Sequence, residues 1–90
     1  MPREIRDVLG ERVHMLRRRR GLSQPELARL ADMSITTLSR VENGHQSLYM
    51  EKVAKLAEVL KTTTDFLLGL AGEPETEDTV GSELLTSAVD

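Results

Sequence analysis

The fold is decided by the stretch between residues 21 and 44, which reads GLSQPELARLADMSITTLSRVENG. Its first half carries strong signals for the start of a helix. Ser23 stands three residues before Glu26, the spacing of a capping box, and Pro25 lies in the first turn, where its missing N–H costs nothing. These signals predict a helix that begins after Ser23 and ends near Asp32. Its expected buried side chains are Leu27, Ala28 and Ala31.

A second short helix is predicted to follow after a tight turn. Ser34 is a good N-cap for a helix from Ile35 to about Glu42, and the pair Asn43-Gly44 terminates it. Leu38 and Val41 are expected to face inward. Two short helices joined by a tight turn, the second opening with small polar residues, are typical of a helix-turn-helix, whose second helix enters the major groove of DNA.

The flanking sequence predicts three more helices. A helix from about Arg3 to Arg20 would end at Gly21. Another is expected at roughly Tyr49 to Leu60, and a short one, capped by Thr63 and closed by Gly69, completes an all-α domain. No strand pattern is visible. The expected apolar faces are Ile5, Leu9, Val13 and Leu16 in the first of these helices, and Met50, Val53, Leu56, Ala57 and Leu60 in the second.

The charge of the chain is divided unevenly along its 90 residues. The formal net charge is −3, but residues 1–72 hold all 12 basic residues against nine acidic ones. Residues 73–90 hold six acidic residues and no basic one. We therefore expect a basic domain over 1–72, suited to binding a polyanion, and an acidic tail over 73–90.

The composition argues against several other classes of protein. There is no cysteine, so a disulfide framework and a cysteine-based zinc site are excluded. No apolar run approaches the length of about 18 residues that a membrane span needs, which favours a cytoplasmic protein without membrane contact. His14 and His45 lie in different elements and are not expected to bind a metal. Neither a catalytic-triad context nor a phosphate-binding loop is present, so we expect no enzyme activity and no cofactor.

Several motifs in order give the chain a family resemblance. Over residues 5–69 it resembles the phage repressor and Cro-like (XRE-type) transcription regulators. The resemblance implies a five-helix lambda-repressor-like domain that binds double-stranded DNA. It rests on Gly21–Ala28 (GLSQPELA), Met33-Ser34, Leu38–Gly44 (LSRVENG), Lys55–Leu60 (KLAEVL) and Asp65–Gly69 (DFLLG).

The resemblance also implies which residues contact DNA. The positions that match base contacts are Ser34, Ile35, Thr36 and Arg40, and those that match phosphate contacts are Gln24, Thr37, Asn43, Arg17 and Arg20. Many relatives carry longer polar side chains at the positions of Ile35 and Thr36, so Arg40 becomes the best candidate for base specificity, because its guanidinium suits guanine O6 and N7. For Arg17 and Arg20, structural salt bridges to acids such as Glu42 are an alternative role. Asp32 replaces a common turn glycine.

A single recognition helix reads only half of a useful site, so we expect a homodimer on an inverted repeat, acting as a repressor. The candidates for the dimer interface are Phe66, Leu70, Leu84, Leu85 and Val89. The acidic tail is open to three interpretations: a solvated terminus, a segment that packs on a partner or on the dimer mate, or one that competes with DNA for the arginine-rich surface. The alternative function is therefore an antitoxin or adaptor that binds another protein through its tail.

Overall fold

A computed structural model of the chain describes residues 3–72, which contain helices and no strand. The predicted all-α class and the predicted five helices are confirmed. Their boundaries differ from the predicted ones by one or two residues at most ends. The helices are α1 (Ile5–Arg19), α2 (Gln24–Leu30), α3 (Ile35–Glu42), α4 (Met50–Leu60) and α5 (Thr64–Leu67).

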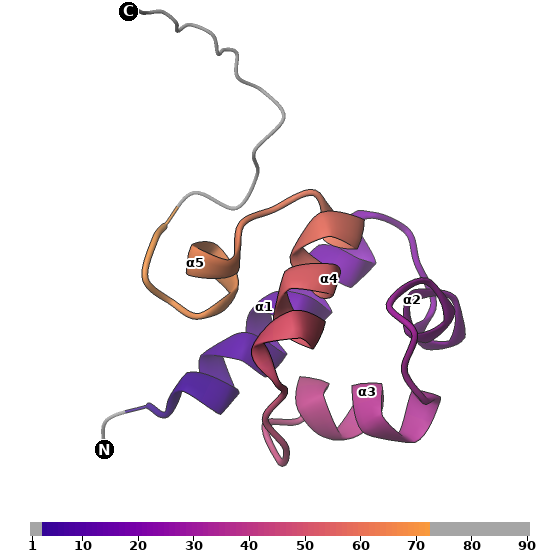
Figure 1. The fold of residues 1–90 in the computed structure, drawn as a ribbon, viewed down its shortest axis with the longest axis horizontal. Helices are drawn as coiled ribbons and strands as arrows, with labels where there is room; N and C mark the ends of the chain where they lie inside the picture. The colour runs from indigo at the N-terminus through magenta and orange to yellow at the C-terminus, as the bar shows by residue number, and fades with distance from the viewer. Residues whose placement is uncertain (1–2, 73–90) are drawn as a thin grey trace, which may run out of the picture.

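The two longest helices form the centre of the domain. Figure 1 shows α1 and α4 crossing there, with α2 and α3 on one side and α5 on the other. The short pair α2 and α3 packs together, and α3 also packs against α1. Because α3 is held by α1 from behind and by α2 at one end, its opposite face remains open to solvent.

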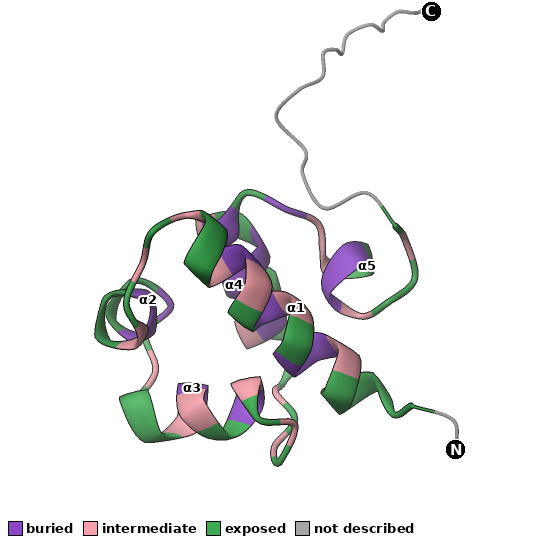
Figure 2. Cartoon of the chain, turned by 180° about the vertical axis from the view of Figure 1, so that it is seen from behind, coloured by how far each residue is buried: buried purple, intermediate pink, exposed green. Residues whose placement is uncertain are grey.

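The core is built from the inward faces of all five helices, as the apolar periodicity predicts (Figure 2). Complete burial of one leucine side chain contributes roughly 1.5–3 kcal/mol, so this set of residues supplies most of the stability of the domain. The side chains buried almost completely are Leu9, Val13, Leu16, Leu27, Leu38, Val41, Leu56, Leu60 and Leu67.

Two residues of the predicted apolar faces lie outside the core. Ile5 is 59% exposed and Met50 is 76% exposed, so the prediction that they are buried is wrong. Each is the first residue of its helix, α1 and α4 respectively. At these positions the helix extends beyond the neighbours that cover its later turns, and helical periodicity alone carries no information about where a neighbour ends.

The starts of the helices use the predicted caps. In α2 the Ser23 hydroxyl accepts from the Glu26 backbone N–H at 3.2 Å, and the Glu26 carboxylate accepts from the Ser23 backbone N–H at 2.7 Å. These hydrogen bonds hold the pKa of Glu26 below its ordinary value. Ser34 caps α3 and Thr63 caps α5 in the same way, each hydroxyl accepting a backbone N–H three residues on.

All five helices in residues 3–72 end in the same geometry. A residue with a positive φ follows the cap, or in α4 is the cap itself, and the next N–H returns to a carbonyl of the last turn, which is the Schellman motif. Glycine occupies this position after α1, α3 and α5, at Gly21, Gly44 and Gly69. Asp32 (φ 56°) and Lys61 (φ 57°) occupy it after α2 and α4.

Gly10, in the middle of α1, allows α3 to approach closely. A Cβ atom at this position would lie 2.2 Å from the backbone oxygen of Val41 and 2.9 Å from that of Glu42. Only glycine leaves room for these carbonyls, which belong to the last turn of α3. Gly10 therefore fixes how deeply the C-terminal end of α3 sits against α1.

Candidate nucleic-acid interface

The residues expected to contact bases lie on α3 and at its N-cap, and all of them are exposed. Ser34, Ile35, Thr36 and Arg40 are exposed, and Ile35 is 49% exposed although it is apolar. On the opposite face Leu38 and Val41 are completely buried. All four predicted base-contacting residues are therefore accessible to a ligand, three of them on α3 and Ser34 at its N-cap.

The first turn of α3 carries a small hydroxyl network. Ser34 Oγ accepts the Thr37 backbone N–H at 3.0 Å and donates its own hydrogen to Thr37 Oγ1 at 2.9 Å. The Ser34 hydroxyl hydrogen is thus already used, whereas the Thr37 hydroxyl still has its own hydrogen to donate. A phosphate oxygen, which can only accept, is a suitable partner for Thr37.

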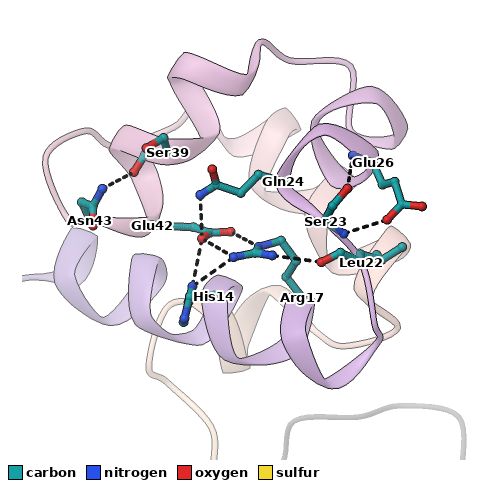
Figure 3. A network of polar contacts seen from close by, with 9 residues as sticks. All are labelled: His14, Arg17, Leu22, Ser23, Gln24, Glu26, Ser39, Glu42 and Asn43. Carbon is teal, nitrogen blue, oxygen red and sulfur yellow. Dashed lines mark hydrogen bonds and ion pairs between the residues drawn. The ribbon is translucent and has the colours of Figure 1, made fainter.

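The C-terminal end of α3 presents two long polar side chains. Arg40 is exposed, and its Nε donates to Gln46 Oε1 in the following loop at 3.0 Å. Asn43 is also exposed, and its Nδ2 donates to the Ser39 carbonyl at 2.9 Å (Figure 3). At both ends of α3, side chains that are predicted to contact DNA are therefore held in defined orientations by hydrogen bonds within the protein.

A polar network behind α3 fixes the three helices of the site (Figure 3). At its centre is the Glu42 carboxylate, whose side chain is only 3% exposed. Oε2 accepts from Arg17 Nε at 2.7 Å, and Oε1 accepts from Arg17 Nη2 at 3.1 Å. Gln24 Nε2 donates to Oε1 at 3.1 Å, and His14 Nδ1 lies 3.0 Å from the same oxygen. One carboxylate therefore joins α1, α2 and α3.

The Glu42 carboxylate is kept ionised by its partners. Burial raises its pKa, but hydrogen bonds from Arg17, His14 and Gln24 together outweigh burial, so the pKa lies below its ordinary value of 4.5. The charge on Glu42 compensates that of Arg17, whose side chain is 12% exposed. The salt bridge between Arg17 and Glu42, which was the alternative role predicted for Arg17, is thus present.

Arg17 and Arg20, both matched to phosphate contacts, have structural roles within the protomer. Arg17 Nη1 also donates to the Leu22 carbonyl at 2.9 Å, which ties the end of α1 to the start of α2. Arg20 Nε donates to the Leu60 carbonyl at 2.9 Å, and Nη2 to the Lys61 carbonyl at 3.3 Å. Arg20 therefore joins the C-terminal ends of α1 and α4, away from the outward face of α3.

The turn between α2 and α3 is supported from α4. Asp32 adopts the left-handed conformation that glycine favours. Lys52 Nζ donates to the Asp32 carbonyl at 2.5 Å and lies 3.6 Å from Asp32 Oδ2. A cation at the C-terminal end of α2 is favourable for the helix dipole as well. The sequence indicated the unusual turn residue, but nothing in it pointed to Lys52.

The candidate dimer residues fall into three groups. The Phe66 ring is buried inside the protomer, 5% exposed, with the Arg12 guanidinium 4.2 Å from its centroid, so it offers little surface to a second copy. Leu70 is 73% exposed and remains available. Leu84, Leu85 and Val89 lie outside the described residues.

An apolar groove that the sequence did not predict lies between α4 and α5. Its volume is about 550 Å³, and the strongly exposed Met50 lies at its edge, with Tyr49 beside it in the chain. The sequence pattern does not reveal the groove, because it predicts Met50 on the buried face of its helix. The groove is lined by Leu48, Met50, Glu51, Val53, Ala54, Thr64 and Leu68.

None of the helices in the described part of the chain is both long and apolar enough to cross a membrane.

A comparison with curated protein sequences gave no significant match. Several solved structures share the fold over most of the chain. The clp gene regulator ClgR from Corynebacterium glutamicum has a TM-score of 0.71 and 25% identity, covering 76% of this chain and 72% of its own.

Two further structures are more similar in sequence. The hypothetical transcription factor NHTF from Neisseria is 30% identical with a TM-score of 0.69, over 76% of this chain and 80% of its own. The restriction-modification controller protein C.AhdI from Aeromonas hydrophila is 31% identical with a TM-score of 0.65, over 69% of this chain and 94% of its own. The family of helix-turn-helix domains matches residues 8–67. The chain therefore belongs to the phage repressor and Cro-like (XRE-type) helix-turn-helix family of DNA-binding transcription regulators.

Proposed function

We propose that this protein is a sequence-specific repressor that binds an inverted repeat in double-stranded DNA as a homodimer, in the cytoplasm. The observation that carries the proposal is the exposure of Ser34, at the N-cap of α3, and of Ile35, Thr36 and Arg40 on the helix itself. An α-helix fits the major groove, hydroxyl groups bond several base edges, and the Ile35 side chain suits a thymine methyl group. Arg40 supplies the side chain best suited to guanine.

The phosphate contacts proposed for Gln24, Thr37 and Asn43 surround this face. Gln24 uses one amide hydrogen on Glu42, which leaves the other for a phosphate oxygen. Thr37 retains a hydroxyl hydrogen, as described above. Such contacts carry no sequence information, but they fix the position of α3 on the duplex. For Arg17 and Arg20 we propose that they hold the helices around α3 in place and do not bind phosphate directly.

The dimer is proposed because one short helix contacts few base pairs, and two-fold pairing doubles the specific contacts. The groove between α4 and α5 supports a location for the interface. It is apolar, and the loop that follows α3 leads directly into it through Leu48. A second copy seated there would bury Met50 and Leu68 of both protomers.

Selection of binding sites from random double-stranded DNA, followed by affinity measurements across salt concentrations, tests this function. We expect an enriched inverted repeat that is bound at least about a thousandfold more tightly than bulk DNA. Arg40→Ala should cost about 1–3 kcal/mol and relax the preference at one position of each half-site. Gln24→Ala should weaken binding to all sequences alike. Lys55→Ala, which removes a half-exposed cation on α4, is the matched control and should change neither quantity.

Failure of the selection to enrich any sequence would contradict the proposal. Full retention of base preference by Arg40→Ala would contradict the docking of α3, because Arg40 would then contact no base. Thermal melting of each variant separates these effects from loss of folding.

A second function is supported by one comparison. The chain is 30% identical to a chain in the SinR protein/SinI protein complex, with a TM-score of 0.64 over 67% of this chain and 59% of that one. A fold of this type is thus found in a complex with another protein. For this chain the candidate segment is the acidic tail, residues 73–90, in an antitoxin-like or adaptor role. Removal of residues 73–90 that abolishes capture of a protein partner and leaves DNA affinity unchanged would favour this function. Tighter DNA binding at low salt after the same truncation would instead indicate that the tail competes with DNA.

A further inference from the structure

The loop that follows α3 holds the guanidinium of Arg40 from one side. Gln46, which is half-buried, accepts the Arg40 Nε hydrogen on its Oε1 at 3.0 Å. Within residues 3–72, neither Nη1 nor Nη2 of Arg40 has a hydrogen-bond partner. The guanidinium therefore has one donor engaged by the protein and its far edge open to solvent.

The backbone fixes the position from which Gln46 acts. The His45 N–H donates to the carbonyl of Arg40 itself at 2.9 Å, and the Gly44 N–H donates to the Val41 carbonyl at 3.0 Å. Gly44 has a φ of 76°, so the turn needs no strained side-chain residue. Two residues after Gln46, Leu48 packs against the core. Gln46 thus lies between His45, whose backbone is bonded to the backbone of Arg40, and Leu48, which is held by the core.

This arrangement selects one edge of the guanidinium for a ligand. An arginine contacts guanine through two parallel N–H donors that match O6 and N7. With Nε engaged by Gln46, the pair that remains is Nη1 and Nη2, at the end of the side chain. An unsupported arginine populates many rotamers, and ordering it on binding has an entropic cost that a pre-formed hydrogen bond reduces.

We propose that Gln46 is a positioning residue for base specificity, which orients the Arg40 guanidinium so that Nη1 and Nη2 face a guanine in the major groove. This role rests on the proposed reading of base pairs by α3. Gln46 itself contacts no base in this arrangement. Its effect is confined to the one base pair that Arg40 reads, and it disappears when Arg40 is absent.

Two substitutions separate the hydrogen bond from the bulk of the side chain. Gln46→Met keeps a similar length and removes the acceptor oxygen, whereas Gln46→Glu keeps an acceptor and adds a negative charge. Affinities are measured for the selected operator and for operators substituted at the base pair where Arg40→Ala loses its preference. Gln46→Met should reduce the preference at that pair about fivefold, the value of one ordinary hydrogen bond, and leave other positions unchanged.

The conservative variant and the double variant complete the test. Gln46→Glu should retain the preference while lowering affinity for all sequences alike, since its charge repels the phosphates. In the Arg40→Ala background, Gln46→Met should cause no further loss of preference. In the absence of DNA, the Arg40 Nε–H signal in NMR spectra should exchange faster with water in Gln46→Met than in the wild type.

The outcomes distinguish this role from the proposed function. A wild-type protein that binds all sequences equally overturns both. A sequence-specific wild type whose base preference is unaltered by Gln46→Met overturns the role of Gln46 alone. The same holds if Gln46→Met lowers the preference equally in the presence and absence of Arg40, because the effect would then pass through the loop rather than through the guanidinium.

Discussion

Substitution of Gly10 by alanine tests whether the close contact between α1 and α3 controls the position of α3. Helix propensity alone favours the change, because alanine is about 1 kcal/mol better than glycine within a helix. The tertiary structure opposes it. The new Cβ would lie 2.2 Å from the Val41 carbonyl oxygen, and contacts below 3.0 Å are essentially never found. The obstacle is backbone, so no side chain can rotate away and α3 itself must move.

Overpacking of this kind costs about 1–3 kcal/mol, and more where backbone has to shift. Taking a cost at the upper end and subtracting the gain in propensity, we expect Gly10→Ala to lower the free energy of unfolding by about 2 kcal/mol. For a domain of this size, that loss corresponds to a fall in melting temperature of roughly 8–16 °C. Operator affinity should fall as well in the fraction that remains folded, because the C-terminal end of α3 carries Arg40 and Asn43.

Thermal denaturation followed by circular dichroism measures the stability, and operator titration below the melting range measures the affinity. Gly72→Ala is the matched control, since a Cβ there meets nothing within 4 Å, and it should leave the melting temperature nearly unchanged. A Gly10→Ala protein as stable as the wild type, with unaltered operator affinity, would refute the reasoning. It would mean that α3 accommodates the methyl group without cost.

Three further predictions concern the Glu42 network, the turn and the apolar groove. Glu42→Gln leaves Arg17 with a buried, uncompensated charge and should lower the free energy of unfolding by about 3 kcal/mol, as measured by urea denaturation. Because the pKa of Glu42 is lowered in the folded state, its stabilisation is complete above its ordinary value of 4.5 and is lost as the pH falls through the folded value. The wild type should therefore lose stability below about pH 4.5 more steeply than Glu42→Gln, and parallel pH profiles would contradict this assignment. Asp32→Gly should keep or raise the melting temperature, whereas Asp32→Val should lower it, since a β-branched residue is strained at a φ of 56°. Met50→Glu should shift sedimentation equilibrium toward the monomer at unchanged melting temperature, and an unaltered dimer would place the interface elsewhere.

The fold followed from local signals that sequence reasoning can detect. The capping residues Ser23, Ser34 and Thr63 and the terminating glycines mark the helix boundaries within one or two residues of their positions in the structure. These signals are reliable because a cap satisfies backbone groups within a few residues of itself, whatever the rest of the chain does. The outward face of α3 could be predicted for the same reason, since Leu38 and Val41 fix the opposite face by periodicity alone.

The roles of the charged residues were less accessible from sequence. Seven arginines stand in the first 20 residues, and their density indicates a basic surface. Yet Arg17 binds Glu42, Arg20 binds carbonyls at the end of α4, and Arg12 lies over Phe66. A sequence pattern cannot divide such residues between solvent and structure, because each guanidinium reaches several ångströms and its partners are up to 59 residues away.

The sequence by itself determined the five helices, most of their inward faces, the basic character of residues 1–72 and the residues that α3 exposes to solvent. Each of these depends on interactions between near neighbours or on composition. Only the tertiary structure decided that Gly10 makes room for the α3 carbonyls, that Lys52 supports the turn at Asp32, and that Gln46 engages Arg40. It also placed Ile5 and Met50 in solvent and Phe66 in the core. These facts depend on how closely the helices approach one another and on where each one ends. The packing of the whole domain sets both, and no local pattern encodes it.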